Sequence, residues 1–152
     1  MQEILGEEKL QVADVGATGG PEERWKKWTD AVFFHTFDPD PRAKPWDIPS
    51  KNHPTGLWSS KCRKTLKLAA YPPATSLYSM NRAETDAFLH HKALHCVGET
   101  EIELDTLDHS LQGQKIDFLK IDAEGAEFEI LKGGNETLKS CLGFQVEVKR
   151  AG

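Results

Sequence analysis

The clearest hydrophobic pattern in the chain is a mostly apolar run, residues 116–121, that ends at Asp122. A second acid, Glu124, and a glycine follow, and residues 126–132 have the composition of a helix. This order predicts a buried parallel strand that turns into a helix. Open α/β sheets bind ligands beyond the carboxyl ends of their strands, so Asp122 and Glu124 are candidate site residues. The structural alternative is that one of them caps the helix.

A second strand-to-turn pattern lies near the amino terminus. Residues 12–15 are apolar except for Asp14, and they open into the glycine-rich stretch from Gly16 to Gly20. Pro21 suits the first position of a helix. Glycines permit positive φ and a close approach of the backbone to a ligand. The dinucleotide pattern G-x-G-x-x-G is not met, because Thr18 stands where its second glycine belongs.

A helix and a further strand follow this turn at a suitable distance. Residues 22–30 read as a helix, in which Trp25 and Trp28 are expected to pack in the core. Residues 32–37 read as a strand that ends at Asp38. An acid about 20 residues beyond a glycine turn can accept hydrogen bonds from ribose hydroxyls. Together these pieces predict a right-handed βαβ nucleoside site.

These segments resemble the FkbM family of S-adenosylmethionine (SAM)-dependent methyltransferases. The resemblance is carried by Asp-Val-Gly-Ala-Thr-Gly-Gly (14–20), Phe-Asp-Pro-Asp-Pro (37–41) and Lys-Ile-Asp-Ala-Glu-Gly-Ala-Glu (120–127), and it covers nearly the whole chain. The third motif is specific, whereas the glycine turn is common to class I methyltransferases. The resemblance implies an α/β, Rossmann-like fold with a mostly parallel sheet and helices on both faces. It also implies SAM as the cofactor.

The resemblance further implies roles for individual residues. The cofactor would be bound by the glycine turn, by the acid after the second strand and by the acid of the signature, which are Asp14, Gly16, Ala17, Thr18, Gly20, Asp38 and Asp122. Asp122 and Glu124 would lie beside the methyl-transfer site. A hydroxyl acceptor benefits from a general base, for which Asp122 and Glu124 are the best-placed candidates and His53 is a weaker one. Residues 56–60 occupy the usual place of the adenine contact, but this chain has serines where the family often has an acid. Lys120 shares side-chain parity with Asp122 and is therefore the nearest candidate to balance its charge.

The carboxyl-terminal end departs from the resemblance. Methyltransferases of this fold usually carry further strands, whereas this chain ends just after a strand expected at residues 144–149. We therefore expect a single domain, residues 1–152, that is short at its carboxyl terminus. That last strand would be an exposed edge, through which two copies of the chain could pair.

Composition limits the classes of partner. The net charge of −5 argues against nonspecific nucleic-acid binding. No apolar run approaches the roughly 20 residues of a membrane helix, and no signal peptide is expected. Three widely spaced cysteines fit reduced thiols better than a disulfide framework, which favours a cytoplasmic protein.

The middle of the chain is the least informative part. Residues 42–54 read as a loop, in which Trp46 is either a lid residue or a staple. Short strands are expected at 65–71 and 99–105, and a helix at 82–92. His90, His91 and His95 invite a metal interpretation, but no third ligand is evident beyond an i, i+4 pair, and no metal site is predicted.

These observations predict a SAM-dependent methyltransferase that methylates an oxygen, on a small molecule or a sugar hydroxyl. O-methylation rests on the resemblance alone. One alternative is a catalytically inactive SAM- or nucleoside-binding module, or a truncated fragment of an enzyme. Another is a dinucleotide oxidoreductase, which the glycine pattern disfavours.

Overall fold

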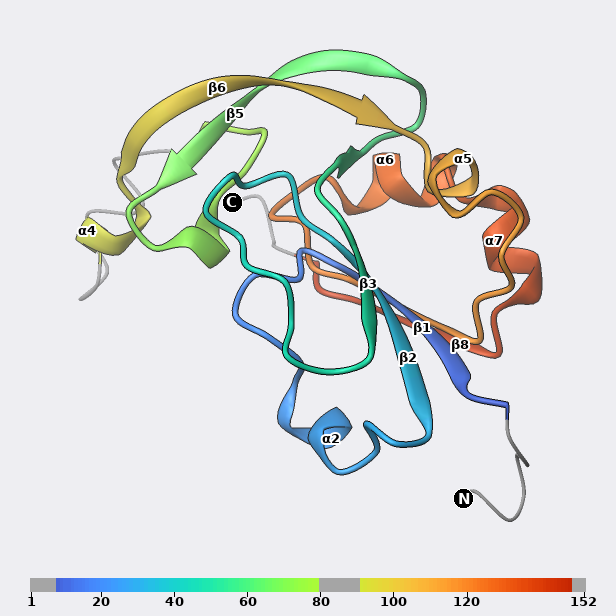
Figure 1. Cartoon of the computed structure of the whole chain (residues 1–152). Coiled ribbons are helices and arrows are strands. Elements are labelled where there is room, and N and C mark those ends of the chain that lie inside the picture. The colour runs from blue at the N-terminus through green and yellow to red at the C-terminus, as the bar shows by residue number, and fades with distance from the viewer. Residues whose placement is uncertain (1–7, 80–90, 149–152) are drawn as a thin grey trace.

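The computed structural model describes residues 8–79 and 91–148, which form two sheets with flanking helices (Figure 1). The larger sheet has five parallel strands in the order β3-β2-β1-β7-β8. Its strands are β1 (Leu10–Val15), β2 (Val32–Phe37), β3 (Ser50–His53), β7 (Phe118–Ile121) and β8 (Gly143–Val146). The three central strands are almost wholly buried, which explains why most of their residues are apolar.

The smaller sheet arches over one end of the larger sheet (Figure 1). It has the order β4-β6-β5, with β4 (Gly56–Leu57), β5 (Cys62–Ala69) and β6 (Cys96–Asp105). The strands β5 and β6 form a long antiparallel pair. One face of the pair carries charged residues such as Arg63 and Glu103, and the other presents Leu66 and Leu104 to the interior.

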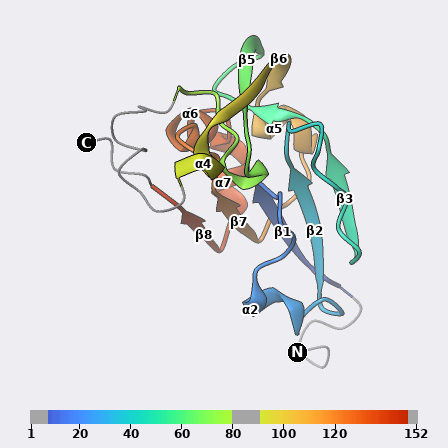
Figure 2. The same cartoon turned by 90° about the vertical axis from the view of Figure 1, so that its left-hand side faces the viewer.

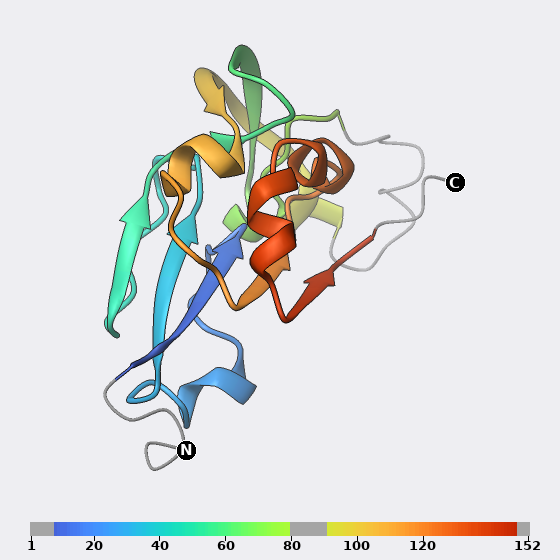
Figure 3. The same ribbon diagram turned by 90° about the vertical axis from the view of Figure 1, so that its right-hand side faces the viewer.

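Helices cover both faces of the parallel sheet (Figures 2 and 3). On one face, α5 (Leu107–Leu111), α6 (Glu127–Lys132) and α7 (Asn135–Ser140) cover the side chains that alternate inward from β1 and β7, among them Ala13 and Leu119. On the other face, α2 (Glu23–Lys26) and the loop before β3 cover Val12 and Phe34. Two short elements, η1 (Pro72–Ala74) and α4 (His91–Leu94), follow β5. The predicted α/β architecture is confirmed.

The strand order places the sheet's reversal of winding between β1 and β7. The chain proceeds outward from β1 to β2 and β3, returns, and then proceeds the other way from β7 to β8. A doubly wound sheet opens a crevice at such a switch point, beyond the carboxyl ends of the two strands. The glycine turn follows β1 and the Asp122 turn follows β7, so the two predicted motifs meet there.

Several sequence predictions for individual elements were wrong. The helix expected over residues 22–30 spans only Glu23–Lys26, and it begins two residues after Pro21. Trp25 packs edge-on against Phe34 and Phe118 as expected, but Trp28 is 38% exposed. The segment expected to be a loop contains β3, and the expected short strand at 65–71 begins earlier, at Cys62. Of the helix expected at 82–92, residues 82–90 lie outside the described part of the chain.

Candidate functional site

The two motifs are joined by direct backbone contact at the switch point. The amide of Gly16 donates to the carbonyl of Phe37 at 2.9 Å, and the amide of Asp122 donates to the carbonyl of Val15 at 2.9 Å. A β-carbon on Gly16 would lie 1.7 Å from the carbonyl oxygen of Asp122, and the φ of Gly16 is +80°. Sequence reasoning attributed this glycine to the approach of a ligand. The structure shows that the approach of the Asp122 backbone already requires it.

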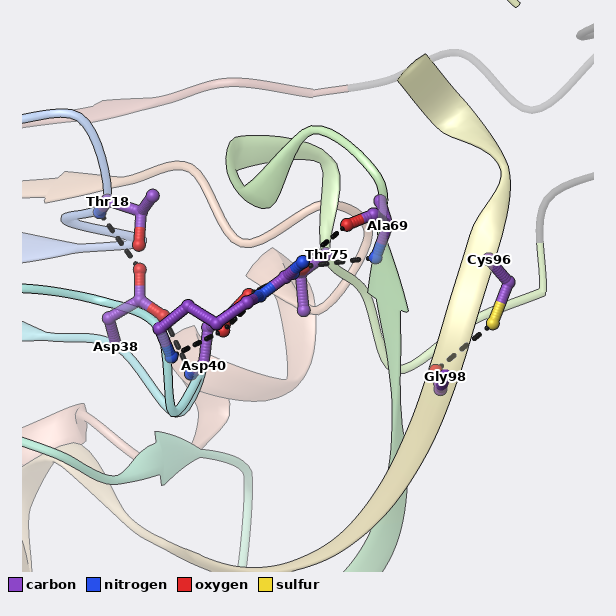
Figure 4. A network of polar contacts seen from close by, with 8 residues as sticks. Thr18, Asp38, Asp40, Ala69, Thr75, Cys96 and Gly98 are labelled. Carbon is purple, nitrogen blue, oxygen red and sulfur yellow. Dashed lines mark hydrogen bonds and ion pairs between the residues drawn. The ribbon is translucent and has the colours of Figure 1, made fainter. Parts of the chain in front are cut away.

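The glycine turn is held by two side chains from the segment after β2. Asp38 accepts the amide of Thr18 through Oδ2 at 2.9 Å and the amide of Asp40 through Oδ1 at 2.9 Å (Figure 4). Trp46 donates its indole N–H to the carbonyl of Ala17 at 2.9 Å and packs against Phe34. Of the two roles considered for Trp46, the structure therefore supports the staple.

Asp40 extends the hydrogen-bond network of Asp38 towards β5 (Figure 4). Its carboxylate accepts two hydrogen bonds from the guanidinium of Arg42, at 2.9 and 2.6 Å, and one from the hydroxyl of Thr75 at 2.8 Å. Burial acts to raise the pKa of Asp40, but the hydrogen bonds from Arg42 and Thr75 outweigh it and hold the pKa below its ordinary value. Asp40 thus fixes the loop after β2 to the end of β5, since Arg42 also donates to the carbonyl of Ala69.

The turn after β7 is capped by a residue that sequence reasoning did not select. Glu127 is buried, and its Oε1 accepts the amides of Ala123 at 3.0 Å and Gly125 at 2.9 Å. The N-cap position of α6 is Ala126, which has no side-chain capping bond. The structure therefore gives the cap neither to Asp122 nor to Glu124. The only signal for Glu127 was its place in the signature, because its role depends on the shape of the turn.

Glu124 is held in this turn by its backbone. Its φ is +52°, in the left-handed region that non-glycine residues seldom adopt. Its carbonyl accepts the hydroxyl of Ser76 at 2.6 Å. A β-carbon on the neighbouring Gly125 would lie 3.1 Å from the ring of Tyr78. The segment after η1 is thus packed directly against the turn that carries the two candidate carboxylates.

A pocket opens at the switch point and brings five predicted residues together. The pocket has an empty volume of about 570 Å³, part of which is open to solvent. It is therefore a cleft and not a sealed void in the core. The predicted residues that line it are Gly16, Thr18, Asp38, Asp122 and Glu124. The hydroxyl oxygen of Thr18 is buried without a hydrogen-bond partner in the described part of the chain.

Three predicted cofactor residues do not line this pocket. Ala17 and Gly20 belong to the turn, but the carbonyl of Ala17 accepts hydrogen bonds from Trp46 and from the amide of Gly20, and Gly20 faces a neighbouring cleft. Asp14 is 1% exposed and lies opposite Lys120, whose Nζ is 3.2 Å from Asp14 Oδ1. Burial raises the pKa of Asp14 to about 7, against the opposing influence of Lys120. The same lysine is 3.8 Å from Asp122 Oδ2, so the predicted partner for Asp122 is confirmed.

His53 lies away from the pocket, at the end of β3. Its ring stacks on Phe37 at 4.3 Å, and burial with the nearby Lys51 lowers its pKa. In the expected adenine segment, Gly56 and Leu57 line the pocket, whereas the hydroxyl of Ser59 donates to Glu129. One group of lining residues comes from the smaller sheet, η1 and the segments beside them, and it was missed because no local pattern predicts their position over the site. This group is Thr55, Leu66, Pro72, Pro73, Thr75, Ser76, Leu77 and Leu104. The other lining residues adjoin the predicted motifs on the parallel sheet side, and they are Val15, Phe37, Pro39, Ala123, Ala126 and Ile130.

Within residues 8–79 and 91–148, no three His, Cys, Asp or Glu side chains are grouped to hold a metal ion. His90 lies outside the described residues. The described helices are also all too short or too polar to span a bilayer.

The strand order, the glycine turn at the switch point and the acids after β2 and β7 define a Rossmann-like domain of the class I methyltransferase type. A family model described as the methyltransferase FkbM domain matches residues 14–151. The chain belongs to that family, and it is a methyltransferase. No curated protein and no solved structure matches it significantly.

Proposed function

We propose that this methyltransferase uses SAM and transfers its methyl group to a hydroxyl oxygen of a small molecule or sugar. Membership of the FkbM family supports methyl transfer in general. The identity of the donor is an inference from the site, which the following observations support, whereas the oxygen specificity rests on the resemblance of the sequence motifs to the family.

The observation that carries the donor assignment is the charge of the pocket. Among the described residues that line it, three are acidic, namely Asp38, Asp122 and Glu124, and none is lysine or arginine. SAM has a sulfonium and an amino group against one carboxylate, so it carries a net positive charge that such a pocket attracts. A dinucleotide carries phosphates, which the same pocket repels.

The helix ends near the pocket also disfavour a phosphate ligand. The amides of Ala123 and Gly125 before α6 are already occupied by Glu127, and the helix after the glycine turn has only four residues. Phosphate sites in nucleotide-binding folds use free amides at the start of a helix. The structure therefore supports a dinucleotide oxidoreductase less well than a SAM-binding methyltransferase.

The residues present fit SAM. Asp38 uses each oxygen for one backbone amide, and a carboxylate has about four acceptor positions, so it can also accept from ribose hydroxyls. The unpartnered hydroxyl of Thr18 is available to a polar group of the ligand. When bound, SAM supplies an electrophilic methyl group on a positively charged sulfur. Asp122 and Glu124 both line the pocket, and in this proposal one of their carboxylates takes the proton that an acceptor hydroxyl loses.

The test is calorimetry of the purified chain with SAM, S-adenosylhomocysteine (SAH) and NAD. We expect SAM and SAH to bind and NAD not to bind; tight NAD binding would refute the donor assignment. Incubation with methyl-labelled SAM and a panel of alcohols, phenols, sugars and amines then tests the acceptor. Transfer to amines alone would refute oxygen specificity, and binding of SAM without any transfer would identify the inactive module.

A further inference from the structure

Three ionisable side chains form a line of contacts that ends at the candidate pocket. Lys120 stands between Asp14, at 3.2 Å, and Asp122, at 3.8 Å. The exposed fractions of the side chains rise from 2% for Asp14 to 11% for Lys120 and 29% for Asp122. The line thus runs from the core to the pocket, and only its outer member, Asp122, lines the pocket.

The fold fixes this line. Asp14 and Lys120 are direct partners in the parallel register of β1 and β7, and Lys120 and Asp122 are two residues apart with the same side-chain parity. One ammonium group therefore serves two carboxylates. On the neighbouring strand β2 the register partner of Asp14 is the uncharged Thr36, and Glu22, before α2, adds a further negative charge near Asp14.

We propose that Lys120 is a positioning residue whose charge is divided between Asp14 and Asp122, so that the proton on Asp14 sets the charge that the pocket presents to the cofactor. This inference rests on the proposed use of SAM. With Asp14 protonated, Lys120 neutralises Asp122, and the three groups together carry no net charge. With Asp14 ionised, they carry one negative charge.

The consequence is discrimination between the cofactor and its product. SAM and SAH share the amino group, carboxylate, ribose and adenine, and they differ by the methyl group and its positive charge. A site with one more negative charge therefore favours SAM over SAH. Burial raises the pKa of Asp14 to about 7, so the change falls near neutral pH.

The measured quantity is the ratio of the SAH to the SAM dissociation constant between pH 6 and pH 8. The sulfonium of SAM lowers the pKa of its own amino group, so the titration of each free ligand is measured separately and removed from its dissociation constant before the ratio is taken. In the wild type we expect it to rise roughly three- to tenfold with pH, the size of a single-charge interaction across about 10 Å of protein.

Two variants should fix the ratio at opposite levels. In Asp14→Asn the lysine neutralises Asp122 at every pH, so the ratio stays at the low-pH value of the wild type. In Lys120→Met the lysine no longer opposes the effect of burial, so Asp14 stays protonated. Asp122 then carries an unneutralised negative charge, and the ratio stays at the high-pH value of the wild type. A structural role for the pair would lower both affinities together and leave the ratio unchanged.

A wild-type ratio that does not vary with pH, or an Asp14→Asn ratio that varies as in the wild type, would overturn the proposal. Failure of the proposed function is distinguishable, because then neither SAM nor SAH binds. If the variants do not fold, wild-type calorimetry at pH 7 in two buffers of different ionisation enthalpy decides. SAM binding should release more protons than SAH binding, and equal release would contradict the proposal.

Discussion

The contact between Gly16 and Asp122 permits a direct test of how the site is assembled. In Gly16→Ala, the new β-carbon would lie 1.7 Å from the Asp122 carbonyl oxygen, about half of an ordinary contact distance. The ends of β1 and β7 must then separate by more than 1 Å on this estimate. That movement stretches the hydrogen bonds from Gly16 to Phe37 and from Asp122 to Val15.

The expected loss of stability in Gly16→Ala is the sum of the backbone strain and the two weakened hydrogen bonds. The left-handed φ costs an alanine about 1–2 kcal/mol. Two weakened hydrogen bonds add about 1 kcal/mol each. The sum of roughly 3–4 kcal/mol corresponds to a fall in melting temperature of roughly 6–16 °C for a domain of this size. Binding of SAH should be lost in the same variant, because Gly16 and Asp122 both line the pocket.

The matched control is Gly20→Ala. Gly20 also has a positive φ, +88°, but no atom lies within 4 Å of its added β-carbon. Only the backbone strain remains, so the melting temperature should fall by roughly 2–8 °C. Thermal denaturation followed by circular dichroism measures both variants. If Gly16→Ala melted no lower than Gly20→Ala, the proposed role of the Gly16–Asp122 contact would be wrong.

Three further predictions concern the acids of the site. Asp38→Ala should weaken SAH binding, measured by calorimetry, by roughly 1.5–3 kcal/mol, which is the range for hydrogen bonds to a charged group. Asp40→Ala should mainly lower the melting temperature, because it releases Arg42. A larger loss of affinity in Asp40→Ala than in Asp38→Ala would reverse the roles of the two residues. Asp122→Asn should keep the melting temperature within about 3 °C, yet reduce SAM affinity or methyl transfer at least about tenfold; an unchanged variant would leave Glu124 as the next candidate. Burial raises the pKa of Asp14 to about 7, so the folded chain keeps a proton that the unfolded chain loses near pH 4. The free energy of unfolding should therefore fall as pH rises from about 4 to about 7, and Asp14 should cause no further fall above that pH. Urea denaturation at pH 5 and pH 8 should show a smaller fall in Asp14→Asn than in the wild type, and an equal fall would contradict the assignment.

The parallel sheet could be predicted from sequence where its strands are buried. Most residues of β1, β2 and β7 are apolar, because helices or loops cover both faces of these strands. The edge strand β3 was missed, since its residues, Ser-Lys-Asn-His, are partly exposed and carry no apolar signal. The helix α2 was predicted too long. Its periodicity continues to Trp28, but the chain turns back early to place Ala31 beside Leu10.

The candidate site could be predicted only in its local parts. Gly16, Thr18, Asp38, Asp122 and Glu124 directly follow strands, and parallel strands bring their carboxyl ends to one edge of a sheet. The roles of Glu127 and Trp46 depend on the path of a turn and a loop, which composition does not define. The hairpin residues Leu66 and Leu104 reach the pocket through pairing across about 40 positions of sequence.

The hairpin that covers the pocket links ligand selectivity to folding energy. Leu66 and Leu104 form part of the pocket wall, and they are also 2% and 1% exposed, so they belong to the core of the smaller sheet. Shortening either side chain would enlarge the pocket, but a buried leucine replaced by alanine costs about 2–5 kcal/mol. That is a large share of the roughly 5–15 kcal/mol that separates a folded domain from its unfolded chain. A variant whose pocket is enlarged through this wall therefore needs a compensating stabilisation elsewhere in the molecule.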